Sequence, residues 1–334
     1  MGYQGRSDMN FFYSRIAGWL MLGMVAGIAM PVASATRSDP YKVITTTGMV
    51  TDIVKAVAGD KAQVVGLMGE GIDPHLYKPN AADVRKVLAS DCIFFNGLML
   101  EGRMADTFFK AARLGKSVYP VTESIDQEFL LEPPEFSGHW DPHVWMDVVA
   151  WSKCVEAVRE ALTQEDPDNG EYYRANCQAY LKKLTGLHQY VKNVIASIPQ
   201  AQRVLITAHD AFNYFARAYG IEVRGVQGIS TESEAGISDI NHIIDFIIDR
   251  NIQAVFIETS VSDKNVRALI EGAKNRGHHV VIGGKLFSDA MGPSGTYEGT
   301  YFGMIDHNAT TIARALGGHA KPGGMKGKLK SDDH

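Results

Sequence analysis

The hydrophobic positions of this chain follow two spacings, short aliphatic runs and longer stretches of helical periodicity. Residues 42–59, KVITTTGMVTDIVKAVAG, begin with an aliphatic run and change to helical spacing that ends at Gly59. Residues 203–220, RVLITAHDAFNYFARAYG, repeat this order and end at Gly220. Each stretch therefore predicts a strand followed by a helix.

Both units continue in the same way, with three more strands separated by helical segments. The strands of the first half are AQVVGLM, CIFFNG and KSVYPVT, and those of the second are IEVRGVQG, AVFIETS and HHVVIGGKL. Strands that alternate with helices predict parallel sheets covered by helices. We therefore expect an α/β protein with two small parallel-sheet lobes, residues 41–165 and 200–318.

A long helical pattern separates the two lobes. Residues 166–199 open with the helix-start signals Asp166, Pro167 and Asp168 and keep helical spacing up to Pro199. We expect one long, rigid linker helix here. The last residues, 319–334, are polar and rich in glycine, and we expect them to be disordered.

The N-terminus carries an apolar run that follows Arg6 and Arg15 and ends in small residues at 33–35. This arrangement is typical of a cleaved secretory signal peptide, which we assign to residues 1–35. The alternative is a retained membrane anchor, although the run is short for a span of about 20 residues. No cysteine follows the run, so we expect no lipoprotein anchor and a soluble protein in the periplasm.

Composition and charge limit the classes of partner that we expect for this protein. The chain has 334 residues, 45% of them hydrophobic, and a net charge of -5. Nucleic acid is not expected as a partner, since no clustered Lys and Arg stand out along the sequence. Cys92, Cys154 and Cys177 have no CxxC spacing, so we interpret them as buried structural thiols and leave a Cys154–Cys177 disulfide open.

The tripeptide Asp-Pro-His occurs twice, at 73–75 and at 141–143, each time followed by an aliphatic and an aromatic residue. Proline restricts its own φ and favours extended backbone for the residue before it, so each imidazole is presented from a stiffened loop. Asp73 and Asp141 are available to accept the second N–H of the imidazole or to cap adjacent backbone.

Several candidate metal ligands follow predicted strands. Ligands of open parallel sheets bind beyond the carboxyl ends of the strands, and His75 and His209 come shortly after such ends. His143 lies in a loop of the first half. Asp289 follows the last strand and fits a metal ligand or a helix N-cap equally well. Together these residues predict a metal site in the cleft between the lobes, with Glu258 supporting a ligand or lining the cleft.

Longer motifs resemble a known family. They are GMVTDIVKAVAGD, GIDPHLYKPNAADVRKVLASDCIFFNGLMLEGRM, DPHVWMDVVAWS, TAHDAFNYFARAYGIEVRGVQGISTESEAG and LFSDAMGPSGTYEGTYFGMIDHN. In this order, across about residues 42–317, they resemble the zinc- and manganese-binding solute-binding proteins of ABC importers, the TroA-like group. The resemblance implies two α/β lobes bridged by one helix, and it places the four metal ligands at His75, His143, His209 and Asp289.

Two departures from the family pattern bear on the metal. Zinc-specialised relatives often carry a long His-rich loop before the second ligand, whereas this chain has only EPPEFSGHW. Typical manganese members have Glu at the third ligand position, where this chain has His209. Three imidazoles and one carboxylate favour Zn²⁺ over the harder Mn²⁺. We therefore predict zinc first, manganese second and iron third.

The resemblance implies capture of the ion outside the cytoplasm and delivery to a membrane permease, by a monomer that catalyses no reaction. One rival hypothesis is a secreted zinc hydrolase, because three His ligands and a water also describe a catalytic site. Against it, Asp289 fills the fourth position and the sequence has no HExxH motif. A metal-binding surface adhesin is a second rival, which no sequence feature separates from transport.

Overall fold

The structure is a computed structural model and describes residues 40–329 of the chain. The predicted signal peptide, residues 1–35, lies outside this part. The N-terminal lobe alternates strands and helices as expected: β1 (Tyr41–Thr45), α1 (Gly48–Ala58), β2 (Ala62–Gly66), α2 (Ala81–Ala89), β3 (Cys92–Phe95), α3 (Ala105–Arg113) and β4 (Ser117–Pro120), followed by α4 (Val148–Glu165). Its strands form one parallel sheet in the order β2-β1-β3-β4.

The C-terminal lobe repeats this alternation after the long helix α5 (Gly170–Ala196). Its elements are β5 (Val204–His209), α6 (Asn213–Tyr219), β6 (Glu222–Gln227), α7 (Ile237–Asp249), β7 (Ala254–Glu258), α8 (Lys264–Asn275), β8 (Val281–Leu286) and α9 (Tyr301–Ala315). The strands pair in parallel as β5-β6 and β7-β8. The α/β fold with parallel sheets is thus confirmed, but the second lobe carries two short sheets where the first has a single larger one.

Short 3₁₀ helices lie in the connections. They are η1 (Gly59–Lys61), η2 (Gly102–Met104), η3 (Gln127–Phe129), η4 (Pro134–Phe136), η5 (Val144–Met146), η6 (Pro167–Asn169) and η7 (Gln200–Gln202). Side chains of the preceding residues define where several α-helices begin. The Asp147 carboxylate accepts the N–H groups of Val149 and Ala150, so α4 starts directly after the second Asp-Pro-His loop.

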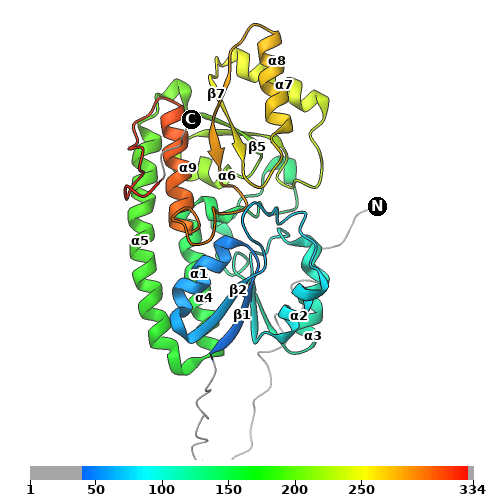
Figure 1. Cartoon of the computed structure of the whole chain (residues 1–334), viewed down its shortest axis with the longest axis vertical. Coiled ribbons are helices and arrows are strands. Elements are labelled where there is room, and N and C mark those ends of the chain that lie inside the picture. The colour runs from blue at the N-terminus through cyan, green and yellow to red at the C-terminus, as the bar shows by residue number, and fades with distance from the viewer. Residues whose placement is uncertain (1–39, 330–334) are drawn as a thin grey trace, which may run out of the picture. The chain divides into compact units, whose positions relative to one another are not determined.

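Helix α5 packs against helices of both lobes. It contacts α1 and α4 of the first lobe and α6 and α9 of the second (Figure 1). Its buried residues Leu184, Leu187, Val191 and Ile195 recur at helical spacing and belong to the main hydrophobic core. Because one continuous core runs through α1, α4, α5 and α9, α5 is held along its length by packing. Its bounds lie within the predicted range 166–199.

The C-terminal segment differs from the prediction. Residues 319–329, which we expected to be disordered, have a defined course in the structure, with turns at 322–327. The buried carboxylate of Asp306 on α9 accepts the backbone N–H of Met325, and Leu329 is 9% exposed. The expectation of disorder is therefore wrong for these residues, since a polar, glycine-rich segment gains an acceptor that only the folded lobe supplies.

The three cysteines are buried, and none of them forms a disulfide. This agrees with their interpretation as structural thiols and shows Cys154 and Cys177 as free thiols. Within residues 40–329, no helix is both long and apolar enough to cross a membrane.

Candidate metal centre

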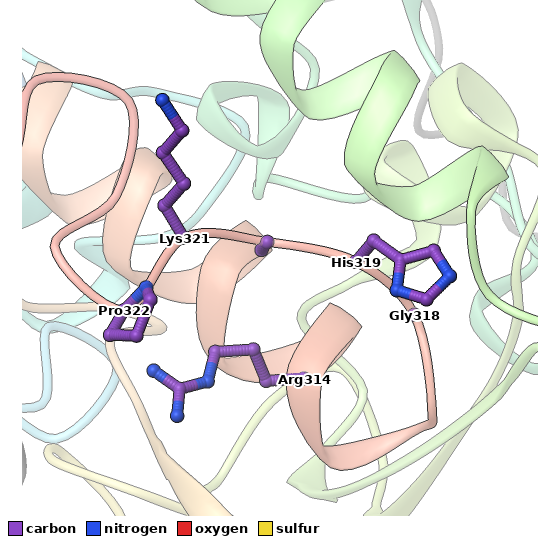
Figure 2. A pocket seen from close by; sticks show the side chains of 6 residues that line it. Arg314, Gly318, His319, Lys321 and Pro322 are labelled. Atoms are coloured by element: carbon purple, nitrogen blue, oxygen red, sulfur yellow. The ribbon is translucent and has the colours of Figure 1, made fainter.

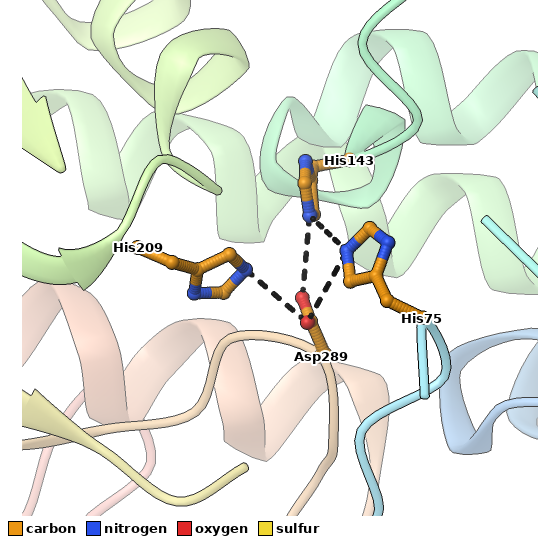
Figure 3. A group of neighbouring side chains, drawn as sticks. All are labelled: His75, His143, His209 and Asp289. Carbon is orange, nitrogen blue, oxygen red and sulfur yellow. Dashed lines mark hydrogen bonds and ion pairs between the residues drawn. The ribbon is translucent and has the colours of Figure 1, made fainter. Parts of the chain in front are cut away.

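Four buried side chains from four separate segments converge at one point (Figure 3). His75 comes from the loop between β2 and α2, His143 directly precedes η5, His209 ends β5, and Asp289 follows β8. His75 is 5% exposed and the other three are 1% or less. One ligand atom from each residue lies within 4.8 Å of all the others. The structure thus brings together the four residues that the sequence predicted.

Four of the distances between ligand atoms are close to the edges of a coordination tetrahedron. The Nε2 atoms of His75 and His143 are 3.4 Å apart, and Asp289 Oδ1 is 3.4 Å from His143 Nε2. Asp289 Oδ2 is 3.2 Å from His209 Nε2 and 3.7 Å from His75 Nε2. Ligand bonds of 2.0–2.1 Å in a tetrahedron give edges of about 3.3 Å. The four groups can therefore surround one divalent ion.

The inward-facing atoms are poorly satisfied by the protein itself. His209 Nε2 and both carboxylate oxygens of Asp289 are buried and form no well-aligned hydrogen bond, although ion-pair distances are short. A buried polar atom without a partner is costly, and such atoms in native proteins point to a ligand or ion. The donor set, three imidazole nitrogens and a carboxylate, is one that Zn²⁺ accepts.

His143 is held by the aspartate of its own loop. Its Nδ1 lies 2.7 Å from Asp141 Oδ1, which also accepts the backbone N–H of His143. Asp141 in turn accepts from Asn213 Nδ2, and its backbone carbonyl accepts from the Tyr214 hydroxyl. The carboxylate thus directs Nε2 towards the centre by fixing a proton on Nδ1.

His209 is held by Glu258 at the end of the neighbouring strand. Glu258 Oε2 lies 2.6 Å from His209 Nδ1, and Oε1 accepts the backbone N–H of His209 at 2.9 Å. Glu258 is 3% exposed and ends β7. The expectation that Glu258 supports a ligand agrees with this geometry.

His75 has a different support. Asp73 Oδ1 accepts the backbone N–H of His75 at 2.9 Å, while Oδ2 accepts the hydroxyl of Thr231 at 2.6 Å. Thr231 lies after β6, so this bond joins the first Asp-Pro-His loop to the C-terminal lobe. Beside it, Arg103 Nε and Glu232 Oε1 form an ion pair at 2.9 Å, and the Arg103 guanidinium also donates to the carbonyl of Leu76.

Burial and the carboxylates set the pKa values of the three imidazoles apart. Burial lowers the pKa of His75 to about 3. Burial also acts to lower the pKa of His143, but the carboxylates of Asp141 and Asp289 outweigh it and raise that pKa to about 9. Glu258 and Asp289 likewise outweigh burial at His209 and hold its pKa well above the usual range. The pKa of Asp289 is held well below its ordinary value because His209 and His143 outweigh the effect of burial.

The structure also bears on the helix N-cap alternative for Asp289. Helix α9 begins only at Tyr301 and has Thr300 as its N-cap, so Asp289 caps no helix there. Trp145 packs beside the site, with its ring centre 5.2 Å from that of His143 and its Nε1 donating to the carbonyl of Ser288.

Sequence reasoning missed Thr231, Asn213 and Asn96. The Asn96 amide donates to the carbonyl of Pro142 and so steadies the second Asp-Pro-His loop. Asn96 directly follows β3 and Thr231 follows β6, and these strand-end positions were the one signal that could have found them.

The fold and the site together define a class: two-lobed α/β proteins in which loops from both lobes enclose a buried cluster of three histidines and one aspartate. Residues 43–315 match the family described as the zinc-uptake complex component A, periplasmic. The chain belongs to this family of metal-binding, substrate-binding proteins of ABC importers. The family resemblance stated from the motifs is thereby confirmed.

Individual relatives agree with this assignment. The chain is 46% identical to the zinc-binding protein TroA of Treponema pallidum over 301 residues, 89% of this chain and 96% of that protein. It is 39% identical to the manganese-binding lipoprotein MntA of Bacillus subtilis over 292 residues, 87% and 95% of the two chains. The solved structure of the periplasmic zinc-binding protein TroA from Treponema pallidum superposes with a TM-score of 0.81 at 47% identity and covers 83% of this chain and 99% of that one.

Proposed function

We propose that this protein binds one divalent metal ion through His75, His143, His209 and Asp289 and delivers it to the membrane permease of an ABC importer. The observation that carries the proposal is that one buried ligand atom from each of the four residues lies within 4.8 Å of the others, with four measured distances of 3.2 to 3.7 Å that are close to the edges of a coordination tetrahedron. The imidazole orientations support it, because Asp141 and Glu258 direct two of the three Nε2 atoms inwards.

Zinc is the ion that this donor set favours. Three imidazoles and one carboxylate suit Zn²⁺, whereas Mn²⁺ prefers oxygen ligands. Asp289 presents Oδ1 to His143 and Oδ2 to His75 and His209, so the carboxylate offers both oxygens to the centre. A second oxygen would raise the coordination number for Mn²⁺, which we rank second, with iron third.

The division of the chain follows from the same proposal. Residues 1–35 act as a cleaved export signal, and the mature protein works as a soluble monomer in the periplasm. The lobes, residues 41–165 and 200–318, enclose the ion, and the helix within 166–199 keeps them at a nearly constant separation. Because α5 packs on both lobes, we expect only a small closure when the ion binds.

Catalysis is not part of the proposed function. A hydrolytic zinc site keeps one position open for water, whereas here a fourth protein ligand, Asp289, completes the set. The adhesin hypothesis keeps the same metal centre and adds a host surface as partner. It is not favoured, because the structure offers no specific observation in its support.

The test is a metal titration of the mature protein. The metal-free protein is titrated with Zn²⁺ and with Mn²⁺ in competition, and bound metal is counted by elemental analysis. We expect one equivalent of tightly bound metal and a preference for Zn²⁺. His209→Ala removes one ligand and should lose most of the affinity.

His139→Ala is the matched control, since His139 is an exposed histidine outside the cluster. It should bind metal as the unaltered protein does. If His209→Ala and His139→Ala bind equally well, or if the protein takes up no stoichiometric metal, the proposed centre is wrong.

A further inference from the structure

Six exposed cationic side chains lie on α5, α9 and the C-terminal segment. We call this surface the basic flank, and it comprises Lys182, Lys183, Arg314, Lys321, Lys326 and Lys328. The chain holds these residues in two stretches, and 131 positions separate Lys183 from Arg314. Their association is therefore a product of the fold.

Direct contacts hold these elements together. Helices α5 and α9 pack side by side, and the hydroxyls of Tyr190 and Thr310 are 2.7 Å apart (Figure 1). The C-terminal segment lies on α5, because a Cβ added at Gly186 would be 3.6 Å from the end of the Met325 side chain. Lys182 and Lys183 are one helical turn before Gly186, and Lys326 follows Met325.

The segments that form the basic flank contain few acidic residues. Residues 172–209 contain no Asp or Glu, and residues 301–329 contain only Asp306. Asp306 is fully buried and accepts hydrogen bonds from the Tyr297 hydroxyl and from the Met325 backbone. The next acids along the sequence are Glu298, in the loop before α9, and Asp332 and Asp333, which follow the C-terminal segment. Since the whole chain carries a net charge of -5, positive charge is concentrated here while the rest of the molecule is acidic.

The flank includes a cavity of about 610 Å³ at the end of α9 (Figure 2). Its lining consists of Arg314, Gly318, His319, Ala320, Lys321 and Pro322. Arg314 and Lys321 are cationic, and none of the six lining residues is acidic. Lys182, Arg314 and Lys321 form no ion pair with any carboxylate of residues 40–329. These three cationic groups are thus available to anions from outside, whereas Lys183 is attracted by the carboxylate of Asp52.

We propose that the basic flank binds the surface of an anionic phospholipid bilayer. Electrostatic attraction acts over a Debye length of about 8 to 10 Å at physiological salt. The attraction to a bilayer is therefore determined by the charge of the flank itself, and the charge of the acidic remainder is screened. Clustered Lys and Arg near an anionic membrane are attracted to its phosphate groups. The choice of a membrane rests on the assigned class, because a substrate-binding protein of an ABC importer acts beside a bilayer. None of the flank residues belongs to the metal centre.

The test is vesicle co-sedimentation of the protein without its signal segment, since residues 40–329 lie within one compact unit. Vesicles contain phosphatidylglycerol and phosphatidylcholine in equal parts, or phosphatidylcholine alone. We expect binding to the anionic vesicles only, and its loss when salt rises from about 50 mM to about 500 mM. The fourfold variant Lys182→Gln, Lys321→Gln, Lys326→Gln, Lys328→Gln should bind at least tenfold more weakly, since each lysine at an anionic surface is worth about fivefold.

The matched control changes four exposed lysines elsewhere: Lys42→Gln, Lys110→Gln, Lys264→Gln and Lys274→Gln. It alters the net charge equally and should keep vesicle binding. Equal loss in both variants, no loss in the flank variant, equal binding to phosphatidylcholine, or no binding by the unaltered protein would each overturn the proposal. Tighter binding to duplex DNA than to the anionic vesicles at the same salt would overturn the assignment to lipid. Zinc stoichiometry, measured on the same samples, separates a failure of the flank from a failure of the metal centre.

Discussion

The two Asp-Pro-His loops have the same sequence signature but are built into the molecule in different ways. In the second loop, Asp141 accepts from both the backbone and the ring of His143. In the first loop, Asp73 accepts from the backbone of His75 and, across the lobes, from Thr231. One aspartate therefore orients an imidazole, whereas the other fastens a loop to the opposite lobe.

This difference shows that a repeated motif can present the same ligand with unequal rigidity. His143 is fixed by the carboxylate of Asp141, which is fully buried and itself accepts a hydrogen bond from Asn213. The support of His75 depends on a contact between the lobes. We therefore expect the second loop to contribute most to metal affinity and the first to the rate at which the ion leaves.

The largest effect on metal affinity is expected from the removal of the Asp141 carboxylate. Asp141→Ala should lower metal affinity by about 10- to 100-fold, because loss of a carboxylate behind a ligating histidine typically costs that much. Asp73→Ala should cost clearly less, since the His75 ring loses no partner. Isothermal titration with Zn²⁺ compares the two variants, with Asp106→Ala, an exposed aspartate, as control. Equal losses at Asp73 and Asp141 would contradict the comparison.

The second-largest effect concerns the release of protons on metal binding, which should distinguish His143 from His75. In the metal-free protein the pKa of His143 is raised to about 9, so this ring carries a proton at pH 7, whereas His75, with its pKa lowered to about 3, does not. Coordination needs neutral imidazole, so binding at pH 7 must expel protons, and affinity should rise with pH up to about 9. Calorimetry in buffers of different ionisation enthalpy measures the release. Binding without proton release at pH 7 would refute this prediction.

A smaller effect is expected at Thr231. Thr231→Val removes the hydroxyl that joins Asp73 to the C-terminal lobe and leaves a partly buried carboxylate without that donor. A hydrogen bond to a charged but only partly buried group is worth about 1.5 kcal/mol, so the metal should dissociate roughly tenfold faster. Stopped-flow mixing with a chelator gives the rate. Thr231→Ser keeps the hydroxyl and should restore the slow release; if serine and valine behave alike, the hydroxyl has no such role.

The smallest effect is expected at Arg103. Its ion pair with Glu232 also links the lobes, but Arg103 and Glu232 side chains are 31% and 51% exposed. Exposed ion pairs contribute about 0 to 1 kcal/mol, so Arg103→Ala should change metal dissociation by less than about fivefold. An effect larger than that of Thr231→Val would show that the exposed pair, and not the hydrogen bond, holds the first loop.

Much of the fold was predictable because it depends on local spacing. The strand-then-helix units, the long helix and the order of elements all follow from periodicity and helix-start signals between neighbouring residues. The two short sheets of the C-terminal lobe and the ordered segment 319–329 were not predicted, since both depend on contacts between remote elements.

The site was predictable to a similar degree. His75, His143 and His209 stood out from a repeated tripeptide and from strand ends. Asp289 was left undecided by the residues around it, because the sequence does not say whether its carboxylate meets a helix or the other ligands.

By itself, the sequence determined which residues could present a ligand, since proline, strand ends and helical spacing act through bonds to near neighbours. Only the tertiary structure decided that Asp141 supports a ring while Asp73 reaches Thr231, and that basic residues 131 or more positions apart lie on elements packed together. The physical reason is that hydrogen bonds and charge clusters depend on distance in space. Packing of α5, α9 and the loops at the strand ends sets those distances.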